Sequence, residues 1–135
     1  MFSEFLNMRM RHVSWQEFDQ LVERIERPIC DSLCPIPRGG LILAVALSHK
    51  FGLPIVERPT RKSVFVDDIA DSGKTILNWK LRYGNTPSVV LFRRASCSPI
   101  GIAAAEVIEG DEWIVFPWEN KEKAQEDYDQ YIARQ

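Results

Sequence analysis

Short apolar segments that alternate with helical ones predict an α/β fold: a doubly wound, mostly parallel central sheet with helices on both faces. Residues 64–66 and 88–92 are almost wholly apolar, which is typical of strands buried on both faces. Residues 73–83 lie between them and have the length and end signals of a helix. The chain of 135 residues suits one domain, residues 1–135, which is large enough to bury a core.

The first elements are a weak strand and a well-marked helix. Apolar and polar residues alternate over 6–11, which favours a strand. Ser14 and Glu17 have the spacing of a capping box, and apolar residues follow at helical spacing. Pro28 ends this helix because the residue before a proline is pushed out of the helical region.

The middle of the chain predicts two strands around an apolar helix. The strands cover 29–36 and 54–57, and the helix covers 41–51, closed by Gly52. Residues 58–63 form a polar, basic connector to the next strand.

The remaining elements continue the alternation. Gly84 is the expected stop of the helix over 73–83, and the last helix has Ala124 and Tyr128 on its inner face, followed by Tyr131 and Ile132. The other expected elements are strands over 64–66, 88–92, 104–108 and 113–116 and a helix over 120–134.

Composition excludes several classes of protein. Seventeen Lys and Arg against nineteen Asp and Glu give a net charge of −2, so no nucleic-acid partner is expected. No apolar stretch approaches the ~20 residues that span a bilayer, and the chain does not start like a signal peptide, so no membrane association is expected. The three cysteines, Cys30, Cys34 and Cys97, have no disulfide or zinc spacing, which favours a reducing, cytoplasmic setting.

The stretch over 64–76 carries the chemistry. A buried strand delivers Asp67 and Asp68 at its carboxyl end, where open α/β sheets bind ligands. A turn follows that contains Asp71 and opens into a helix, whose first N–H groups favour a phosphate. Carboxylates in this position can accept hydrogen bonds from a vicinal diol or hold Mg²⁺ partly through water.

Two other interpretations fit parts of this stretch. Gly73-Lys74-Thr75 suggests a nucleoside-triphosphate loop, but that motif needs a glycine where Asp68 stands. The acids are also compatible with a solvated strand end and a helix cap. Three acids in five residues, joined to a buried strand and a Ser-Gly-Lys-Thr turn, favour a ligand site instead.

Residues 64–76 resemble the phosphoribosyl-pyrophosphate (PRPP) motif of the type I phosphoribosyltransferases. Residues 36–40 resemble the pyrophosphate loop of that family, and residues 111–119 resemble the base-binding end of its xanthine-guanine and hypoxanthine branch. The resemblance covers residues 12–120 and implies the type I fold with a reduced hood. It also implies an enzyme, a purine phosphoribosyltransferase: PRPP and a 6-oxopurine base (guanine, xanthine or hypoxanthine) give a purine nucleoside monophosphate and pyrophosphate, with Mg²⁺ as cofactor.

The resemblance also implies roles for single residues. Asp67 and Asp68 would hold the ribose hydroxyls, and Asp71 would be the general base that faces the N7 proton of the purine. The 5′-phosphate would be bound by Asp71, Ser72, Gly73, Lys74 and Thr75. Pyrophosphate would be bound by Pro37, Arg38, Gly39 and Gly40, with the Pro37–Arg38 peptide in cis.

Purine and metal contacts follow from the same resemblance. Trp113 would stack on the base, Ile114 would offer backbone groups to it, and Arg94 would stand where the family has a lysine for the 6-oxo oxygen. Asp68 and, through water, Glu119 would lie near the metal.

One departure from the family is the lid, because only residues 58–63 stand where a long mobile loop is usual. Arg58, Arg61 and Lys62 could supply charge to PRPP directly, or a neighbouring subunit could cover the site in a homodimer or homotetramer. Alternatively, the protein binds PRPP or a nucleotide as a non-catalytic regulator, or has a purely structural role without either ligand.

Overall fold

The computed structural model describes residues 9–134, which divide into two compact units. The larger unit is Leu21–Gly110, and the smaller one combines Met1–Gln20 with Asp111–Gln135. The boundary falls inside helix α2 (Trp15–Arg24). Each unit is described by itself, and the single domain expected from the length stays a prediction.

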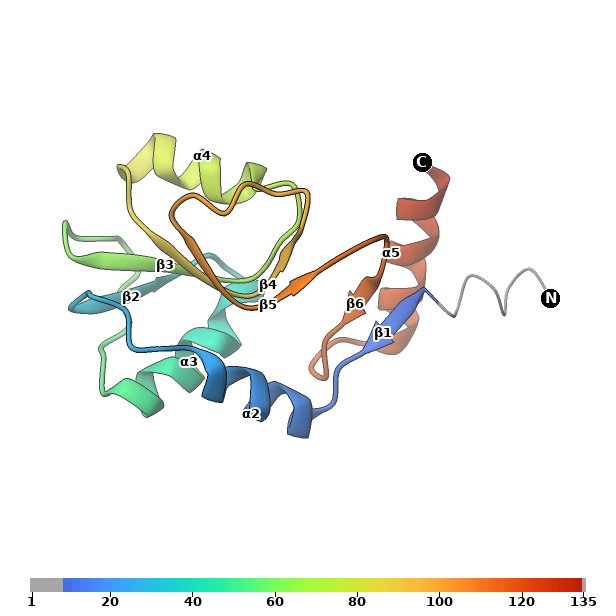
Figure 1. Ribbon diagram of the computed structural model, residues 1–135, viewed down its shortest axis with the longest axis horizontal. Coiled ribbons are helices and arrows are strands. Elements are labelled where there is room, and N and C mark those ends of the chain that lie inside the picture. Colours follow the sequence, from blue (N-terminus) through green and yellow to red (C-terminus); the bar gives the residue numbers. More distant parts are fainter. Residues whose placement is uncertain (1–8, 135) are drawn as a thin grey trace. The chain divides into compact units, whose positions relative to one another are not determined.

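A parallel four-stranded sheet forms the centre of the larger unit (Figure 1). Its strands lie in the order β2-β3-β4-β5, and all three neighbouring pairs are parallel. The strands are β2 (Ser32–Pro35), β3 (Ser63–Ala70), β4 (Ser88–Arg94) and β5 (Ile102–Ile108). Their inward positions are apolar, so the sheet is the core that the sequence predicts.

The order of the strands reverses beside β2. After β2 the chain passes through helix α3 (Gly39–Phe51) and reaches Ile55, which forms a parallel bridge with Leu33. The next strand, β3, pairs with the other side of β2, so Leu33 lies between Ile55 and Val64. A reversal of this kind leaves a crevice at the carboxyl ends of the strands, which is where α/β sheets bind ligands.

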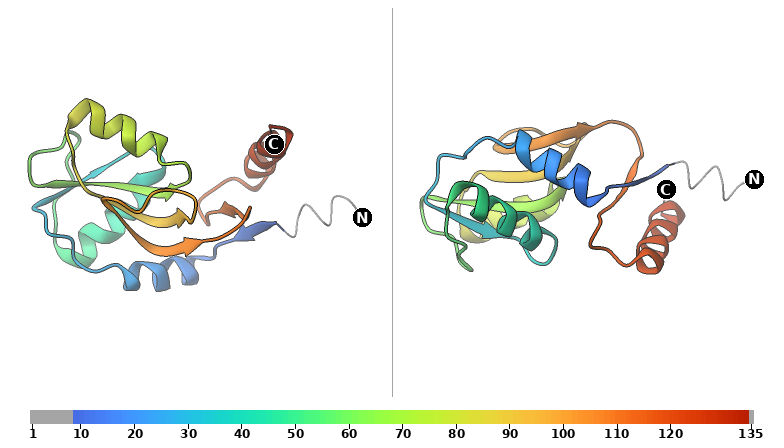
Figure 2. Two further views of the ribbon diagram at one scale, coloured as in Figure 1. Left: turned by 45° about the horizontal axis from the view of Figure 1, so that its top comes forward. Right: turned by 90° about the horizontal axis from the view of Figure 1, so that it is seen from below.

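Helices lie on both faces of this sheet, as the sequence predicts. Helix α4 (Lys74–Tyr83) covers one face and α3 the other, which the left view of Figure 2 also shows. Gly84 ends α4 and Gly52 ends α3, each donating its backbone N–H to a carbonyl of the last turn. Phe65 and Val90 of the sheet belong to the core cluster on which the indole of Trp79 packs.

The smaller unit contains a two-stranded parallel sheet and a terminal helix. Strand β1 (Met10–His12) pairs with β6 (Trp113–Val115), and α5 (Lys121–Ala133) follows. Ser14 accepts a hydrogen bond from the N–H of Glu17 at 3.0 Å, so the N-terminal cap of α2 predicted from the sequence is present. The rings of Phe116 and Trp118 stack with their centroids 4.7 Å apart.

Several element bounds differ from the sequence prediction. Strand β3 continues through Asp67 and Asp68 to Ala70, because β4 pairs with it along this length. The strand expected over 54–57 contributes one bridge, at Ile55. Residues 113–115 pair with β1 rather than with the central sheet, and the expected strand over 6–11 lies partly outside the described residues.

Two further observations concern the cysteines and the length of the helices. Cys30, Cys34 and Cys97 are free, as their spacing predicts. Within residues 9–134, no helix is both long and apolar enough to cross a bilayer.

Candidate functional site

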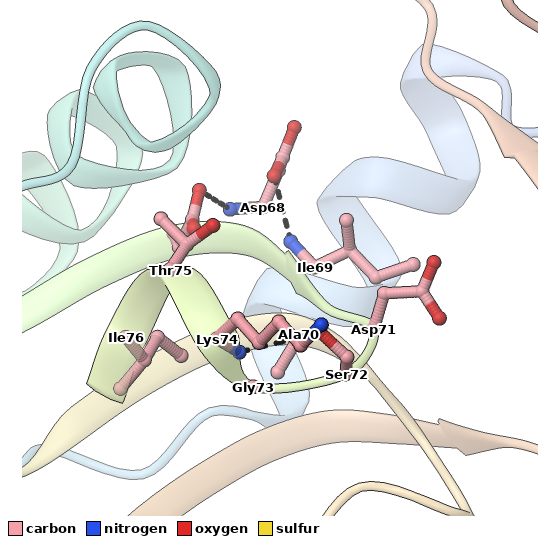
Figure 3. Close-up of a pocket in the computed structure, with 10 residues that line it drawn as sticks. Asp68, Ile69, Ala70, Asp71, Ser72, Gly73, Lys74, Thr75 and Ile76 are labelled. Carbon is pink, nitrogen blue, oxygen red and sulfur yellow. Dashed lines mark hydrogen bonds between the residues drawn. The ribbon is translucent and has the colours of Figure 1, made fainter. Parts of the chain in front are cut away.

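A cavity of about 230 Å³ lies at the carboxyl end of β3, lined by residues 67–76 (Figure 3). It includes the strand end, the turn after it and the first residues of α4. The acidic and small residues that the sequence predicts as a site therefore line a single cavity.

Asp67 and Asp68 are adjacent carboxylates at the inner side of this region. Asp67 is 8% exposed, and its Oδ1 accepts the N–H of Asp68 at 2.9 Å. Asp68 Oδ1 accepts the N–H of Ile69 at 2.7 Å. Burial and the neighbouring Asp68 carboxylate raise the pKa of Asp67 to about 8. Burial also raises the pKa of Asp68. Two carboxylates held this close fit hydroxyl donors or a cation.

The turn after β3 is shaped to receive an anion. Gly73 has φ +85°, a conformation that glycine adopts without steric cost, and it stands immediately before α4. Ser72 Oγ accepts the N–H of Lys74 at 3.3 Å (Figure 3). Gly73 is the N-cap residue and has no side chain to bond the helix, so among the described residues N–H groups of the first turn other than that of Lys74 remain for a ligand.

The loop between β2 and α3 lies against the same strand end. The Pro37–Arg38 peptide is cis, as the resemblance implies. The N–H of Ile36 donates to the carbonyl of Val66 at 2.8 Å, beside Asp67. A Cβ on Gly39 would stand 2.5 Å from Asp68 Oδ2, and one on Gly40 would overlap the carbonyl oxygen of Val66. The close approach of this loop to β3 therefore requires a glycine at position 40, whereas a Cβ at position 39 would displace the Asp68 side chain.

Arg94 and Asp71 form an ion pair that sequence reasoning did not predict. Arg94 Nε donates to Asp71 Oδ1 at 2.6 Å, and Arg94 Nη1 donates to the carbonyl of Gly110 at 3.0 Å. The signal for this pair is the register: Ala70 pairs with Arg93, so the next residue of each strand lies at the same level. The sequence does not predict this register, so the prediction from sequence gave Asp71 and Arg94 separate roles.

The remaining predicted site residues lie in the smaller unit. The ring of Trp113 packs on that of Tyr131, with centroids 4.9 Å apart, and its buried Nε1 has no hydrogen-bond partner among the described residues. Ile114 is buried in β6. Glu119 Oε1 accepts the N–H of Phe116 at 2.9 Å. Trp113, Ile114 and Glu119 thus belong to the smaller unit, whereas the acids of β3 belong to the larger one.

The basic connector lies at the opposite end of the sheet from the cavity. The N–H of Thr60 donates to Ser63 Oγ at 2.8 Å, and the carbonyl of Lys62 accepts the N–H of Asp31 at 2.9 Å. Ser63 begins β3, and a strand rises about 3.3 Å per residue, so Asp67 is roughly 13 Å further along. The explanation that Arg61 and Lys62 supply charge to the site is thus not supported.

A metal ion would find few protein ligands. No group of three or more His, Cys, Asp or Glu side chains with metal-binding geometry occurs among the described residues. The Asp67 and Asp68 carboxylates are hard oxygen donors whose mutual repulsion a divalent cation would relieve. They fit Mg²⁺ that takes its other ligands from water or from a bound phosphate.

Comparisons with known proteins agree on the fold. No family model and no curated protein matches the sequence. A purine phosphoribosyltransferase from Pyrococcus horikoshii is similar in structure, with a TM-score of 0.63 and 24% identity, over 83% of this chain and 95% of that one. The xanthine-guanine-hypoxanthine phosphoribosyltransferase of Helicobacter pylori gives 0.62 and 24%, over 87% and 97%.

A third solved structure is a hypothetical protein from Neisseria gonorrhoeae with bound ppGpp. Its TM-score is 0.60 at 17% identity, over 90% of this chain and 97% of that one. The chain thus has the α/β fold of the type I phosphoribosyltransferases, with mostly parallel strands flanked by helices, as the sequence motifs predict.

Proposed function

We propose that the protein is a purine phosphoribosyltransferase. It transfers the 5-phosphoribosyl group of PRPP to a 6-oxopurine, guanine, xanthine or hypoxanthine, and releases pyrophosphate. The fold supports the general class of transferase, since the two similar structures named above are purine phosphoribosyltransferases. The substrate and the chemistry are proposed from the residues of the site.

The observation that carries this proposal is the meeting of three groups at one strand end. Paired carboxylates, Asp67 and Asp68, end β3; an anion-binding turn, residues 71–75, follows them; and the 37–40 loop lies against Asp68. PRPP presents a diol between two phosphate groups. The carboxylates suit the diol, the turn suits the 5′-phosphate, and the loop suits the diphosphate.

The reaction requires stabilisation of charge more than covalent catalysis. The bond between C1 of the ribose and the diphosphate oxygen breaks, a bond from the purine N9 to C1 forms, and pyrophosphate leaves with the bonding electrons. Backbone amides and Arg38 in the 37–40 loop neutralise the leaving charge. Asp71 takes the N7 proton as N9 attacks, which is general base catalysis by a positioned carboxylate.

The cofactor and the base contacts complete the proposal. Asp68 would hold Mg²⁺, which would supply positive charge to the diphosphate group. For the base we propose stacking on Trp113, backbone contacts from Ile114 and a donor from Arg94, with Glu119 near the water shell of the metal. Tyr131 now covers one side of the Trp113 ring, so a base would use its other side or displace the tyrosine.

A PRPP-dependent assay with each of the three bases in Mg²⁺ tests the proposal. Formation of a nucleoside monophosphate with at least one base is the expected result. Asp71→Asn should lower turnover by ~10²-fold or more and leave PRPP affinity nearly unchanged, because only the proton acceptor is lost. Unchanged turnover in this variant would remove the general-base role from Asp71.

The second candidate is a non-catalytic protein that binds PRPP or a nucleotide. Two observations favour it: the connector that replaces the lid is fixed at the far end of the sheet, and one similar structure holds ppGpp. PRPP or nucleotide binding by calorimetry, without product from any base, would select this candidate. Absence of any binding would leave only a structural role.

A further inference from the structure

Arg94 is the most buried charged side chain at the site, and its guanidinium is committed to two partners. It stands at the end of β4 with 7% of its surface exposed. Nε is 2.6 Å from Asp71 Oδ1, and Nη1 is 3.0 Å from the carbonyl oxygen of Gly110. A buried charge is tolerated only when it is paired and hydrogen-bonded, so both contacts hold the guanidinium in place.

Asp71 depends on this contact for its orientation. Its side chain is 46% exposed and projects from the turn away from Ser72 and Lys74 (Figure 3). Within residues 9–134, Arg94 supplies the hydrogen bond that the Asp71 carboxylate accepts. A half-exposed carboxylate without such a contact samples several rotamers, whereas a proton acceptor must keep one geometry.

We propose that Arg94 is the positioning residue for Asp71. The inference rests on the proposed function, in which Asp71 is the general base, and it assigns Arg94 a task besides contact with the purine. Nε fixes the carboxylate, and Nη1 fixes the guanidinium to the backbone at Gly110, where the larger unit ends. Within the part of the chain that the structure describes, Nη2 has no hydrogen-bond partner and remains for a ligand.

The need for two fixed contacts explains an arginine here. A guanidinium is a rigid planar fork and can bond two acceptors in set directions, whereas a lysine ammonium is a single flexible point charge. Arg93, the preceding residue of β4, bonds only backbone carbonyls: its Nη1 is 2.7 Å from the oxygen of Cys97. Arg93 is therefore a matched control on the same strand, with no acidic partner within residues 9–134.

Steady-state kinetics of Arg94→Gln, Arg94→Lys and Arg93→Gln test the inference. We expect Arg94→Gln to lower kcat by ~10²-fold, the cost of a mispositioned catalytic group, while KM for PRPP changes less than about 3-fold. KM for the base should rise as well, because the proposed donor to the base is lost. Arg94→Lys should fall between this variant and the parent, and Arg93→Gln should keep kcat. In an Asp71→Asn background, Arg94→Gln should cause no further loss. A large rise in KM for the base with kcat preserved would overturn the inference in favour of direct base contact alone.

A spectroscopic readout separates this inference from the proposed function. The side-chain carboxylate ¹³C resonance of Asp71, assigned with Asp71→Asn, should move in Arg94→Gln and Arg94→Lys but stay in place in Arg93→Gln. Should the parent protein lack transferase activity, the proposed function fails and this resonance still reports the contact. An unmoved resonance in both Arg94 variants overturns the inference. If Arg94→Gln does not fold, Arg94→Lys decides.

Discussion

At the residue level, ionisation of the buried Asp67 carboxyl group lowers the stability of the folded protein. A carboxyl group that is 8% exposed and adjacent to another carboxylate resists ionisation, and its pKa is raised to about 8. The usual value for aspartate is about 3.9, so the unfolded chain ionises Asp67 far more readily than the folded one. The folded state therefore favours the protonated carboxyl. As the pH rises and Asp67 ionises, the folded state becomes less stable relative to the unfolded one.

The free energy of unfolding should consequently fall as pH rises. The contribution of Asp67 is fully present below about pH 4 and is lost progressively as the pH approaches 8. Asp67→Asn removes this dependence, so we expect the variant to gain roughly 3 kcal/mol over the parent at pH 8 compared with pH 5. Thermal denaturation without divalent cations measures the difference.

Asp19→Asn is the control for this experiment, because Asp19 is exposed on α2. It should follow the parent at both pH values. Parallel pH profiles for the parent and Asp67→Asn would show that Asp67 ionises normally in the folded protein.

At the scale of elements, helix α2 is held at its carboxyl end by a side chain from α3. Lys50 Nζ donates to the carbonyls of Val22, Glu23 and Ile25 at 3.0, 3.1 and 3.0 Å. These are carbonyls of the last turn and the residue after it, positions that a helix leaves largely without backbone partners, although the Val22 carbonyl also accepts the N–H of Ile25 at 3.1 Å. A cation at this end also interacts favourably with the helix dipole.

Lys50→Met should thus destabilise the protein by about 2 kcal/mol, since hydrogen bonds from a charged donor are lost and carbonyls are left without a partner. Urea denaturation measures the loss. Lys121→Met, at an exposed position of α5, should change the free energy of unfolding by less than ~0.5 kcal/mol. Equal small effects in both variants would contradict a capping role for Lys50.

The start of α3 offers a second test at this scale, because its two glycines face different atoms. A Cβ at position 40 meets the backbone of Val66, which cannot move without the strand, so Gly40→Ala should cost about 3 kcal/mol. A Cβ at position 39 meets only the Asp68 carboxylate, a side chain that can turn away.

Gly39→Ala should therefore keep most of the stability, within ~1 kcal/mol, and weaken PRPP binding by ~10-fold through displacement of Asp68. Calorimetry with PRPP and Mg²⁺, beside urea denaturation of both variants, measures the two effects. If Gly39→Ala binds PRPP like the parent, Asp68 does not need its present position for binding.

At the scale of the whole molecule, local patterns predicted elements better than their pairing. The apolar run of 64–66 located β3, yet its end at Ala70 depends on a ladder with β4 that no local pattern encodes. Residues 113–115 had a strand pattern, but period-two alternation does not say which strand is the partner. The residues that line the cavity could be predicted from the sequence because they are consecutive, over 67–76.

Contacts between distant segments were predicted less well. The ion pair between Asp71 and Arg94 depends on the β3–β4 register, and the approach of Gly39 to Asp68 depends on how β2 meets β3. The placement of the basic connector required the pairing of Ser32 with Ser63, whose hydroxyl oxygens are 2.6 Å apart. Each of these facts follows from sheet topology rather than from sequence neighbours.

The basic connector, residues 58–63, is held far from the acids of β3 by the topology of the sheet. Because Thr60 and Lys62 are hydrogen-bonded at the amino end of the sheet, the charges of Arg61 and Lys62 start a strand length from Asp67. A pair of exposed charges separated by more than ~10 Å is largely screened at 0.1 M salt. The double variant Arg61→Gln/Lys62→Gln should accordingly keep the KM for PRPP, or its Kd, within about 2-fold of the parent.

Arg38→Gln, at the loop beside Asp68, should raise the same constant by ~10-fold, since it removes a charge from the proposed diphosphate subsite. A tenfold loss of PRPP affinity in the connector variant would mean that residues 58–62 leave the amino end and reach the ligand, which is the motion of a lid.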